Sequence, residues 1–315
     1  MNKTKIGFSL LGIALIGGGI GLLTSLTSCG NSRSIITLYF TDGRSHSVHT
    51  IDDFNKLCSN SFHNTTITFD DGFSFVKDTL LSVRGFQNNM ISHIPDYFLA
   101  NCTAFNYGLG LPSSITSIGL GFLSGCTGFD GDISLSRTHI TECGDGFLQF
   151  CSSFNGSIIF PSTMQKISKY FLYNCTSFNQ PLTIPDSVVA IDNRFLGNAS
   201  AFNSELILSN SLETLSNNFL ESCELFNQPL QLPSLLNSIG SDFLARCDNL
   251  TSTINFGALD TSIFSVTSEW TFSVVESTAD AYTTGMTIDG DNASGIKALF
   301  PDSGTMPYRK VHIAI

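Results

Sequence analysis

Hydrophobic residues recur with a period of about 24 residues along the segment 91–256. Each copy contains a Phe-Leu pair, and successive pairs lie 24 residues apart. The one exception is the step of 25 residues from Phe122 to Phe147, where the loop 136–139 contains one extra residue. When each of these phenylalanines is counted as position 0, positions −7, −4, +1, +4, +7, +11 and +13 are apolar or Cys in nearly every copy. The phenylalanines at position 0 are Phe98, Phe122, Phe147, Phe171, Phe195, Phe219 and Phe243. This self-similarity predicts about seven copies of one structural unit.

A unit of about 24 residues cannot bury its apolar side chains alone, so the copies must stack and share one core. We therefore expect a solenoid. The apolar residues at +11 and +13 flank a single residue, an alternation typical of a short strand, as in residues 181–184. Pro follows at +14 in four copies and ends the strand. Equivalent strands of stacked copies predict a parallel sheet along one face.

Residues 1–28 have the organisation of a signal peptide, with Lys3 and Lys5 before an uncharged apolar run. The run ends in Leu26-Thr27-Ser28-Cys29, which resembles the lipobox of bacterial lipoproteins. That resemblance implies that Cys29 becomes the N-terminal residue and carries acyl chains such as palmitate, and that residues 29–34 form a lipidated tether. The protein would then be anchored in the bacterial cell membrane and exposed on the outer surface. An uncleaved transmembrane anchor and a soluble secreted form are the alternatives.

The segments on either side of the repeats lack this period, and we expect them to cap the open ends of the solenoid. Within residues 35–90, strands 35–40 and 47–49 should form a hairpin around Asp42-Gly43. Thr50 should cap a helix over 51–58, and residues 61–90 should form a degenerate first repeat. Residues 257–315 are expected to form the C-terminal cap.

Cysteine and asparagine recur at fixed positions of the repeat. Six of the nine Cys lie at position +4, and Ala199 takes this position in the fifth copy, which indicates a small buried residue and not a disulfide framework. There is no C-x-x-C pair or His-Cys cluster, so we expect no metal and no cofactor. Asn or Asp occupies +8 in six copies. These side chains could face a ligand, but we favour a ladder that bonds the backbone of adjacent turns.

Composition excludes several functional classes. The 315 residues hold 15 Lys and Arg against 26 Asp and Glu, a formal net charge of −11, which argues against binding nucleic acid. Apolar residues make up 42% and charged residues 13%, too apolar for a disordered chain. No catalytic motif is present, so we expect no enzyme. An activity carried by the C-terminal segment is the remaining alternative.

The repeat is similar to a known family. Residues 111–119 (LPSSITSIG), followed by Phe122 and Cys126, resemble the BspA-like (Treponema-type) leucine-rich repeat of bacterial surface proteins. The segments 178–182 and 226–230, both FNQPL, resemble the surface repeats of mycoplasma lipoproteins. The resemblance implies a leucine-rich-repeat solenoid of α/β type, with a parallel sheet on one face, a small N-terminal α+β cap and a C-terminal cap. One departure is that three residues, not two, separate +7 from +11.

This resemblance implies adhesion or binding of host or extracellular proteins. We expect the contact stripe at positions +10 and +12 of the central copies, because these residues vary while the core positions do not. The stripe consists of Pro181, Thr183, Glu205, Ile207, Pro229 and Gln231. A structural or shielding coat lipoprotein without a specific ligand is the alternative, since the stripe carries no aromatic residue and little charge.

Overall fold

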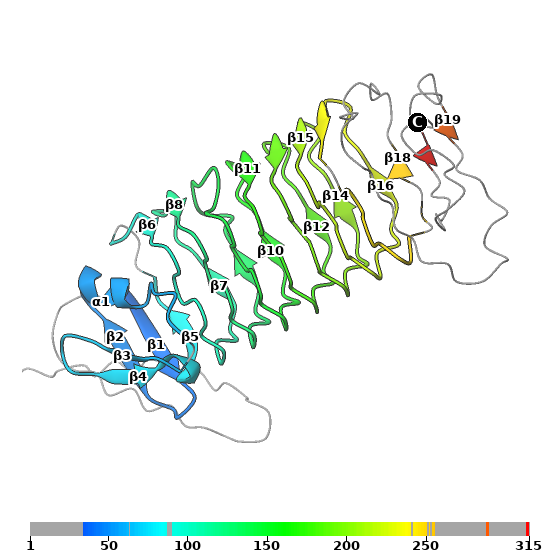
Figure 1. Cartoon of the computed structure of the whole chain (residues 1–315). Coiled ribbons are helices and arrows are strands. Elements are labelled where there is room, and N and C mark those ends of the chain that lie inside the picture. Colours follow the sequence, from blue (N-terminus) through cyan, green and yellow to red (C-terminus); the bar gives the residue numbers. More distant parts are fainter. Residues whose placement is uncertain are drawn as a thin grey trace, which may run out of the picture.

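The computed structural model describes residues 34–62, 64–86, 90–240, 242–250 and 252, and the backbone of 254–255, 288–289 and 313–314. The expected signal peptide of residues 1–28, the expected lipidation site Cys29 and most of the segment 257–315 therefore lie outside the described residues. Among the described residues, no helix combines the length and the apolar character needed to cross a membrane. Figure 1 shows an elongated stack of turns, with the elements of residues 36–84 gathered at one end.

Two rows of parallel strands run along the stack. The first ladder comes from positions +11 and +12, and the second comes from −5 and −4. In both ladders paired residues lie one repeat apart, as Leu182 and Leu206 do in the first and Ile191 and Leu215 in the second. The first ladder contains β7 (Leu109–Gly110), β9 (Ile133–Ser134), β10 (Ile158–Ile159), β12 (Leu182–Thr183), β14 (Leu206–Ile207), β16 (Leu230–Gln231) and β18 (Ile254–Asn255). The second contains β6 (His93–Ile94), β8 (Ser117–Ile118), β11 (Lys166–Ile167), β13 (Ala190–Ile191), β15 (Thr214–Leu215) and β17 (Ser238–Ile239).

The solenoid with a parallel sheet is confirmed, but the repeat differs from the expected α/β type. The described residues 90–240 contain no helix, and a second ladder takes the other long side of each turn. The first ladder is also divided into the groups β7–β9–β10, β12–β14 and β16–β18. The divisions fall before Pro181 and Pro229, the two copies with Pro at +10. Proline has a fixed φ and no N–H, so it fits poorly in a continuous ladder.

The third side of each turn consists of positions −1 to +3 and has an unusual backbone. Positions −1 and +3 have φ between 57° and 74° in all seven copies. Their N–H groups donate to carbonyls of the next turn, as Gly146 does to Lys169 at 2.8 Å and Phe150 to Tyr173 at 2.9 Å. The left-handed residues therefore complete a third line of hydrogen bonds between turns. The residues are Tyr97, Gly121, Gly146, Tyr170, Arg194, Asn218 and Asp242 at −1, and Asn101, Gly125, Phe150, Asn174, Asn198, Ser222 and Arg246 at +3.

The core between the three sides is filled by two columns of phenylalanine. Consecutive rings at position 0 lie 4.6–6.1 Å apart between centroids, and those at +7 lie 5.4–5.8 Å apart. Most are stacked with small interplanar angles, as Phe154 and Phe178 are at 2°. All are buried, together with the described apolar and Cys residues at positions −7, −4, +1, +4, +11 and +13. The core assigned from the period is thus confirmed.

An N-terminal unit closes the first turn. Strands β1 (Ile36–Phe40), β2 (Ser45–Val48) and β5 (Leu80–Arg84) form an antiparallel sheet in the order β2–β1–β5. The helix α1 (Ile51–Lys56) is two residues shorter than expected, and Thr50 caps it as expected. Phe54 of α1 stacks on Phe98 of the first repeat with centroids 5.4 Å apart, and Leu99 donates to the carbonyl of Leu57 at 3.0 Å.

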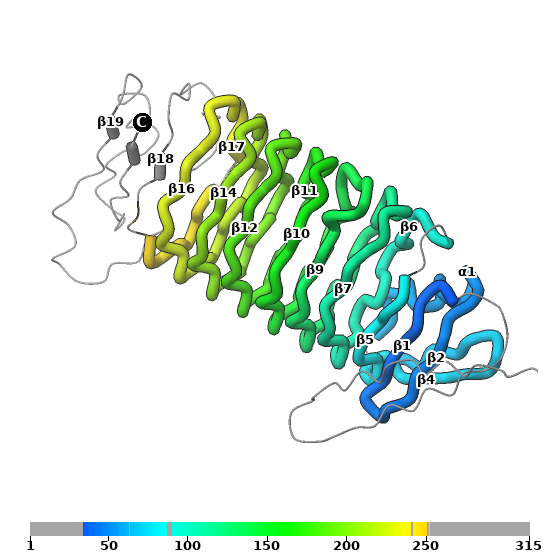
Figure 2. The backbone as a smooth tube through the Cα atoms, turned by 180° about the vertical axis from the view of Figure 1, so that it is seen from behind, coloured from blue at the N-terminus to red at the C-terminus, as the bar shows by residue number. Residues whose placement is uncertain are grey.

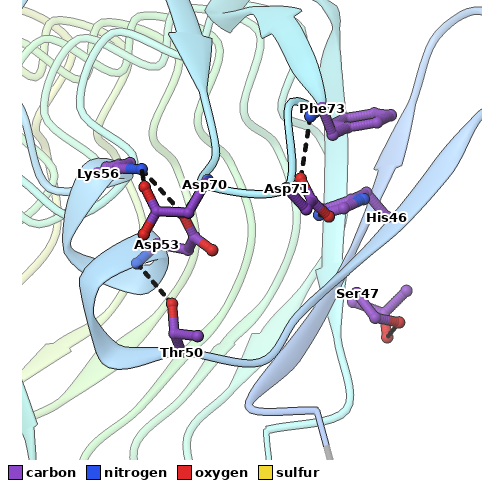
Figure 3. A network of polar contacts seen from close by, with 9 residues as sticks. His46, Ser47, Thr50, Asp53, Lys56, Asp70, Asp71 and Phe73 are labelled. Carbon is purple, nitrogen blue, oxygen red and sulfur yellow. Dashed lines mark hydrogen bonds and ion pairs between the residues drawn. The ribbon is translucent and has the colours of Figure 1, made fainter. Parts of the chain in front are cut away.

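The segment 61–90 differs from the expected degenerate repeat. Strands β3 (Thr66–Thr68) and β4 (Ser74–Val76) pair as an antiparallel hairpin, and the 3-10 helix η1 (Lys77–Thr79) leads into β5, which pairs with β1. Figure 3 shows how polar contacts join this hairpin to the helix. Lys56 of α1 bonds Asp53 at 3.0 Å and Asp70 at 2.5 Å, and Asp53 also accepts from the backbone N–H of Asp70 at 2.9 Å.

At the opposite end, two strands of the segment 257–315 extend the first ladder. The backbone of β20 (Ile313–Ala314) pairs with β18, and β19 (Ile288–Asp289) pairs with β20, all in parallel. The rest of the expected C-terminal cap lies outside the described residues.

Candidate functional site

The structure places all six residues of the expected stripe on one exposed surface. Thr183, Ile207 and Gln231 are the outward residues of β12, β14 and β16, whose other residues are buried. Pro181, Glu205 and Pro229 precede these strands and are exposed as well. Figure 2 shows the strands of this ladder lying side by side along the stack.

The β12–β14 pairing sets Thr183 directly beside Ile207. Ile207 keeps 47% of its surface exposed, and Ile159, at the same position two turns earlier, keeps 52%. Gln231 is less available than its neighbours, because its amide donates to the carbonyl of Leu232 at 2.9 Å. The stripe therefore presents the aliphatic side chain of Ile207 among prolines and polar residues, with Glu205 as its one charged group, and Ile159 lies on the same surface two turns away.

A hollow on the third side of the solenoid was not foreseen from the sequence. It has a volume of about 810 Å³ and extends from the N-terminal unit to the fourth repeat. Tyr97, Phe150 and Tyr170 are its aromatic lining, and Asn101, Gln149 and Asp145 are among its polar lining. The signal that could have revealed it is glycine at −1 or +3, where other copies carry a side chain. These glycines are Gly121, Gly125 and Gly146.

The asparagines at +8 are used by the fold. The side-chain oxygen of each accepts the backbone N–H of the next turn, from Asn106 with Asp130 at 2.8 Å through Asn203 with Asn227 at 2.8 Å. The intermediate links from Asp130, Asn155 and Asn179 measure 2.8, 2.8 and 2.7 Å. The structural ladder, and not a row of free amides, is therefore confirmed.

The thiols at +4 are buried and poorly suited to chemistry. Burial raises the pKa of the Cys102 thiol to about 12 and places those of Cys126 and Cys151 well above their ordinary value. A thiolate is the reactive form, so these groups are inert at neutral pH. No cluster of three or more His, Cys, Asp or Glu side chains able to hold a metal is found among the described residues.

Two titratable groups of the N-terminal unit also have structural roles. The amine of Lys77 is fully buried and donates to the carbonyl of Ser59 at 2.7 Å, and burial lowers its pKa. The ring of His46 stacks on Phe73 with centroids 4.2 Å apart, and its Nε2 lies 3.3 Å from Asp71 (Figure 3). Burial is the main reason that the pKa of His46 is lowered, and Asp71 opposes this shift.

Two solved structures of leucine-rich-repeat proteins are similar to this chain. The crystal structure of a leucine rich cell surface protein from Faecalibacterium prausnitzii A2-165 is 16% identical, with a TM-score of 0.43 over 62% of this chain and 53% of that chain. A leucine rich repeat protein of T. pallidum is also 16% identical, with a TM-score of 0.32 over 62% of this chain and 69% of that chain. This chain thus spans about half the length of the F. prausnitzii chain. No curated protein matches it.

The sequence pattern of one family does match. The pattern described as the BspA type leucine rich repeat region occurs in six copies, over residues 73–203 and 149–271. These matches overlap and together extend over more than half of the 315 residues. They include every repeat whose geometry is described above. The chain therefore belongs to the family of proteins with BspA-type leucine-rich repeats.

Proposed function

We propose that this protein is a bacterial lipoprotein displayed on the outer surface, which binds host or extracellular proteins through the stripe on the first ladder. Proteins with leucine-rich repeats generally mediate protein interactions, and this fold is typically not enzymatic. The observation that carries the proposal is the common exposure of Pro181, Thr183, Glu205, Ile207, Pro229 and Gln231 on one side of the stack.

The composition of this surface suits a protein partner. Protein interfaces combine a few apolar contacts with a polar surround. Ile159 and Ile207 supply apolar contacts, and Thr183 and Glu205 supply hydrogen-bonding and charged groups beside them. Seven strands about 4.8 Å apart give the ladder a length of roughly 30 Å.

The proposed anchor is Cys29. Cleavage before it removes Lys3 and Lys5 and no acidic residue, so the mature chain is more acidic than the full chain. Anionic headgroups repel such a body, and the tether 29–34 lets it stand away from the bilayer. Two or more acyl chains give the stable attachment that one chain does not.

Metabolic labelling tests the anchor separately from the binding function. Cells supplied with a labelled fatty acid should incorporate it into the wild-type protein and not into Cys29→Ser. Equal labelling of both proteins would refute lipidation at Cys29. A cleaved but unlabelled protein would favour the secreted form instead.

The binding function is tested with purified residues 30–315 and a panel of extracellular-matrix proteins, serum proteins and intact host cells. We expect saturable binding to at least one of them. Replacing the six stripe residues with Ser should raise the Kd at least tenfold. A matched control, Val189→Ser with Glu213→Ser and Asn237→Ser, changes exposed residues beside the second ladder and should leave the Kd unchanged.

Two outcomes would count against the proposal. Unchanged binding by the six-residue variant would show that the stripe is not the contact surface. The absence of saturable binding across the panel would favour the coat hypothesis, which already gains support from the single charged group and the lack of aromatic residues in the stripe.

A further inference from the structure

The hollow on the third side exists because two successive turns lack a side chain at position −1. Tyr97 and Tyr170 occupy this position in the first and fourth turns, whereas Gly121 and Gly146 occupy it in the second and third. All four have a left-handed backbone, with φ of 59°, 58°, 64° and 74° respectively. Two tyrosines therefore stand at the ends of a stretch with no side chain at this position between them.

The glycines also allow lining residues to lie in close contact with them. A Cβ added at Gly121 would come within 2.5 Å of the Tyr97 ring, and one at Gly125 would collide with the amide of Asn101. The contact with the Tyr97 ring thus requires glycine at Gly121, whereas its φ does not, because Tyr97 and Tyr170 adopt a similar φ at the same position. The ring of Tyr97 and the amide of Asn101 form part of the surface of the hollow.

Aromatic rings from three turns surround the hollow. Phe150 keeps 44% of its surface exposed, although a large apolar side chain favours burial. Tyr173 supports both Phe150 and Tyr170 edge-on, with centroid distances of 5.7 and 5.4 Å. These contacts orient the rings before any ligand arrives, which reduces the entropy lost on binding.

The polar groups of the hollow both donate and accept hydrogen bonds. The amide of Asn101 donates to the carbonyl of Ser61 at 3.0 Å, which orients it, and the hydroxyl of Ser124 bonds the carbonyl of Gln149 at 3.3 Å. The side-chain amide of Gln149 has no hydrogen-bond partner among the described residues. Asp145 is the only carboxylate in the lining, and there is no Lys or Arg.

This lining distinguishes between classes of ligand. An anionic ligand finds no cationic side chain there. A pyranose has a C–H face that packs on aromatic rings, and its hydroxyls donate and accept, as amide and hydroxyl side chains do. The volume of about 810 Å³ falls within the range of about 300–1,000 Å³ that is typical of small-molecule sites. We propose that this hollow binds a short neutral oligosaccharide, with sugar rings against Tyr97 and Phe150 and hydroxyls bonded to Asn101 and Gln149.

The site is independent of the proposed protein-binding stripe, because it lies on a different side of the repeat. Purified residues 30–315 would be titrated with maltotriose, cellotriose, chitotriose and N-acetyllactosamine, and with sialyllactose as the anionic comparison. We expect saturable binding of at least one neutral sugar. The six-residue stripe variant should bind that sugar with an unchanged Kd, so the two proposals can fail separately.

Two variants of different kinds test the location. Phe150→Ala removes an exposed ring. Gly125→Asn displaces the amide of Asn101, with which its Cβ would collide, and uses the residue that Asn101, Asn174 and Asn198 place at the same backbone position. Each should raise the Kd for the sugar at least tenfold. The matched control Leu225→Ala removes an exposed side chain elsewhere on the stack and should leave the Kd unchanged. Circular dichroism checks folding, and Gln149→Ala replaces Gly125→Asn if that variant does not fold.

Three results would overturn the proposal. The first is no saturable binding of any neutral sugar by the wild-type protein. The second is binding that neither Phe150→Ala nor the second variant weakens. The third is a preference for sialyllactose over every neutral sugar of the panel.

Discussion

At the scale of the residue, position +8 shows how one side chain links each turn to the next. The oxygen of Asn179 accepts the N–H of Asn203 at 2.7 Å and lies 3.0 Å from the hydroxyl of Ser204. Asp130 does the same in its copy, so the role requires an acceptor and not an amide. The preference for Asn and Asp was therefore interpretable from the sequence.

Replacing Asn179 with Ala should lower the free energy of unfolding by about 1 kcal/mol, because one net hydrogen bond is lost. Asn179→Asp keeps the acceptor and should stay within about 0.5 kcal/mol of the wild type. Urea unfolding at neutral pH measures both changes. Equal losses in the two variants would contradict the role of the acceptor.

Position +4 gives a second example at this scale. The Cys175 thiol donates to the carbonyl of Leu148 in the preceding turn at 3.1 Å, and Cys126, Cys151, Cys223 and Cys247 make the same contact at 3.1–3.2 Å. Ala199 lacks this donor. The exchange of Cys for Ala showed that the position is small and buried. It did not show that the thiol bonds a carbonyl, because that partner belongs to another turn and is remote in the sequence.

At the scale of the element, each strand of the ladders has only two residues, so its stability depends on the equivalent strands of the neighbouring turns. Each contributes few hydrogen bonds, and the phenylalanine columns bind the turns together. The first ladder was predictable because the apolar positions +11 and +13 lie on either side of position +12, whose residue differs between copies. The second ladder was not, because only position −4 of its strands is consistently apolar and a two-residue strand gives no alternation to detect.

Truncating one phenylalanine of a column tests how much the column contributes to the free energy of unfolding. Phe154 lies between Phe129 and Phe178 at centroid distances of 5.4 and 5.5 Å. Phe154→Ala should cost about 3–5 kcal/mol, because it leaves a cavity in a closely packed core. Phe150→Ala removes a ring of the same size that is 44% exposed, and it should cost much less. Similar losses in urea unfolding would show that the columns do not carry the stability.

At the scale of the whole molecule, the buried thiols make stability depend on pH. Seven Cys are buried, and burial raises the pKa of each in the folded state. In the unfolded chain a thiol ionises with its ordinary pKa of about 9.0. Above that pH the unfolded state binds fewer protons than the folded state, so stability falls as the pH rises.

We therefore expect the urea midpoint to be nearly constant between pH 7 and 8 and to fall steeply above about pH 9. Each thiol that ionises only on unfolding contributes about 1.4 kcal/mol per pH unit. The triple variant Cys126→Ala, Cys151→Ala and Cys175→Ala should lose stability less steeply over the same range. Ala199 shows that the repeat accepts this residue. Equal slopes would mean that other groups, such as tyrosines, cause the alkaline loss.

In the N-terminal unit, the local turn and helix cap were predictable from the sequence, and the pairing of distant strands was not. The hairpin around Asp42-Gly43 and the cap at Thr50 were predictable, because turn and cap preferences act within a few residues. The pairing of β5 with β1 sets Val83 beside Leu38, which is remote from it in the sequence. No local pattern identified that partner, and the segment instead suggested a degenerate repeat.

The period, the core positions, the family and the +8 ladder all follow from the sequence alone, because each repeats at a constant spacing and depends on residue type. The second ladder, the left-handed third side and the hollow required the tertiary structure. These depend on hydrogen bonds between turns and on φ values that Tyr, Arg, Asn and Gly adopt alike at position −1. Apolar periodicity reports which residues are buried, and it carries no information about which backbone groups meet once the turns are stacked.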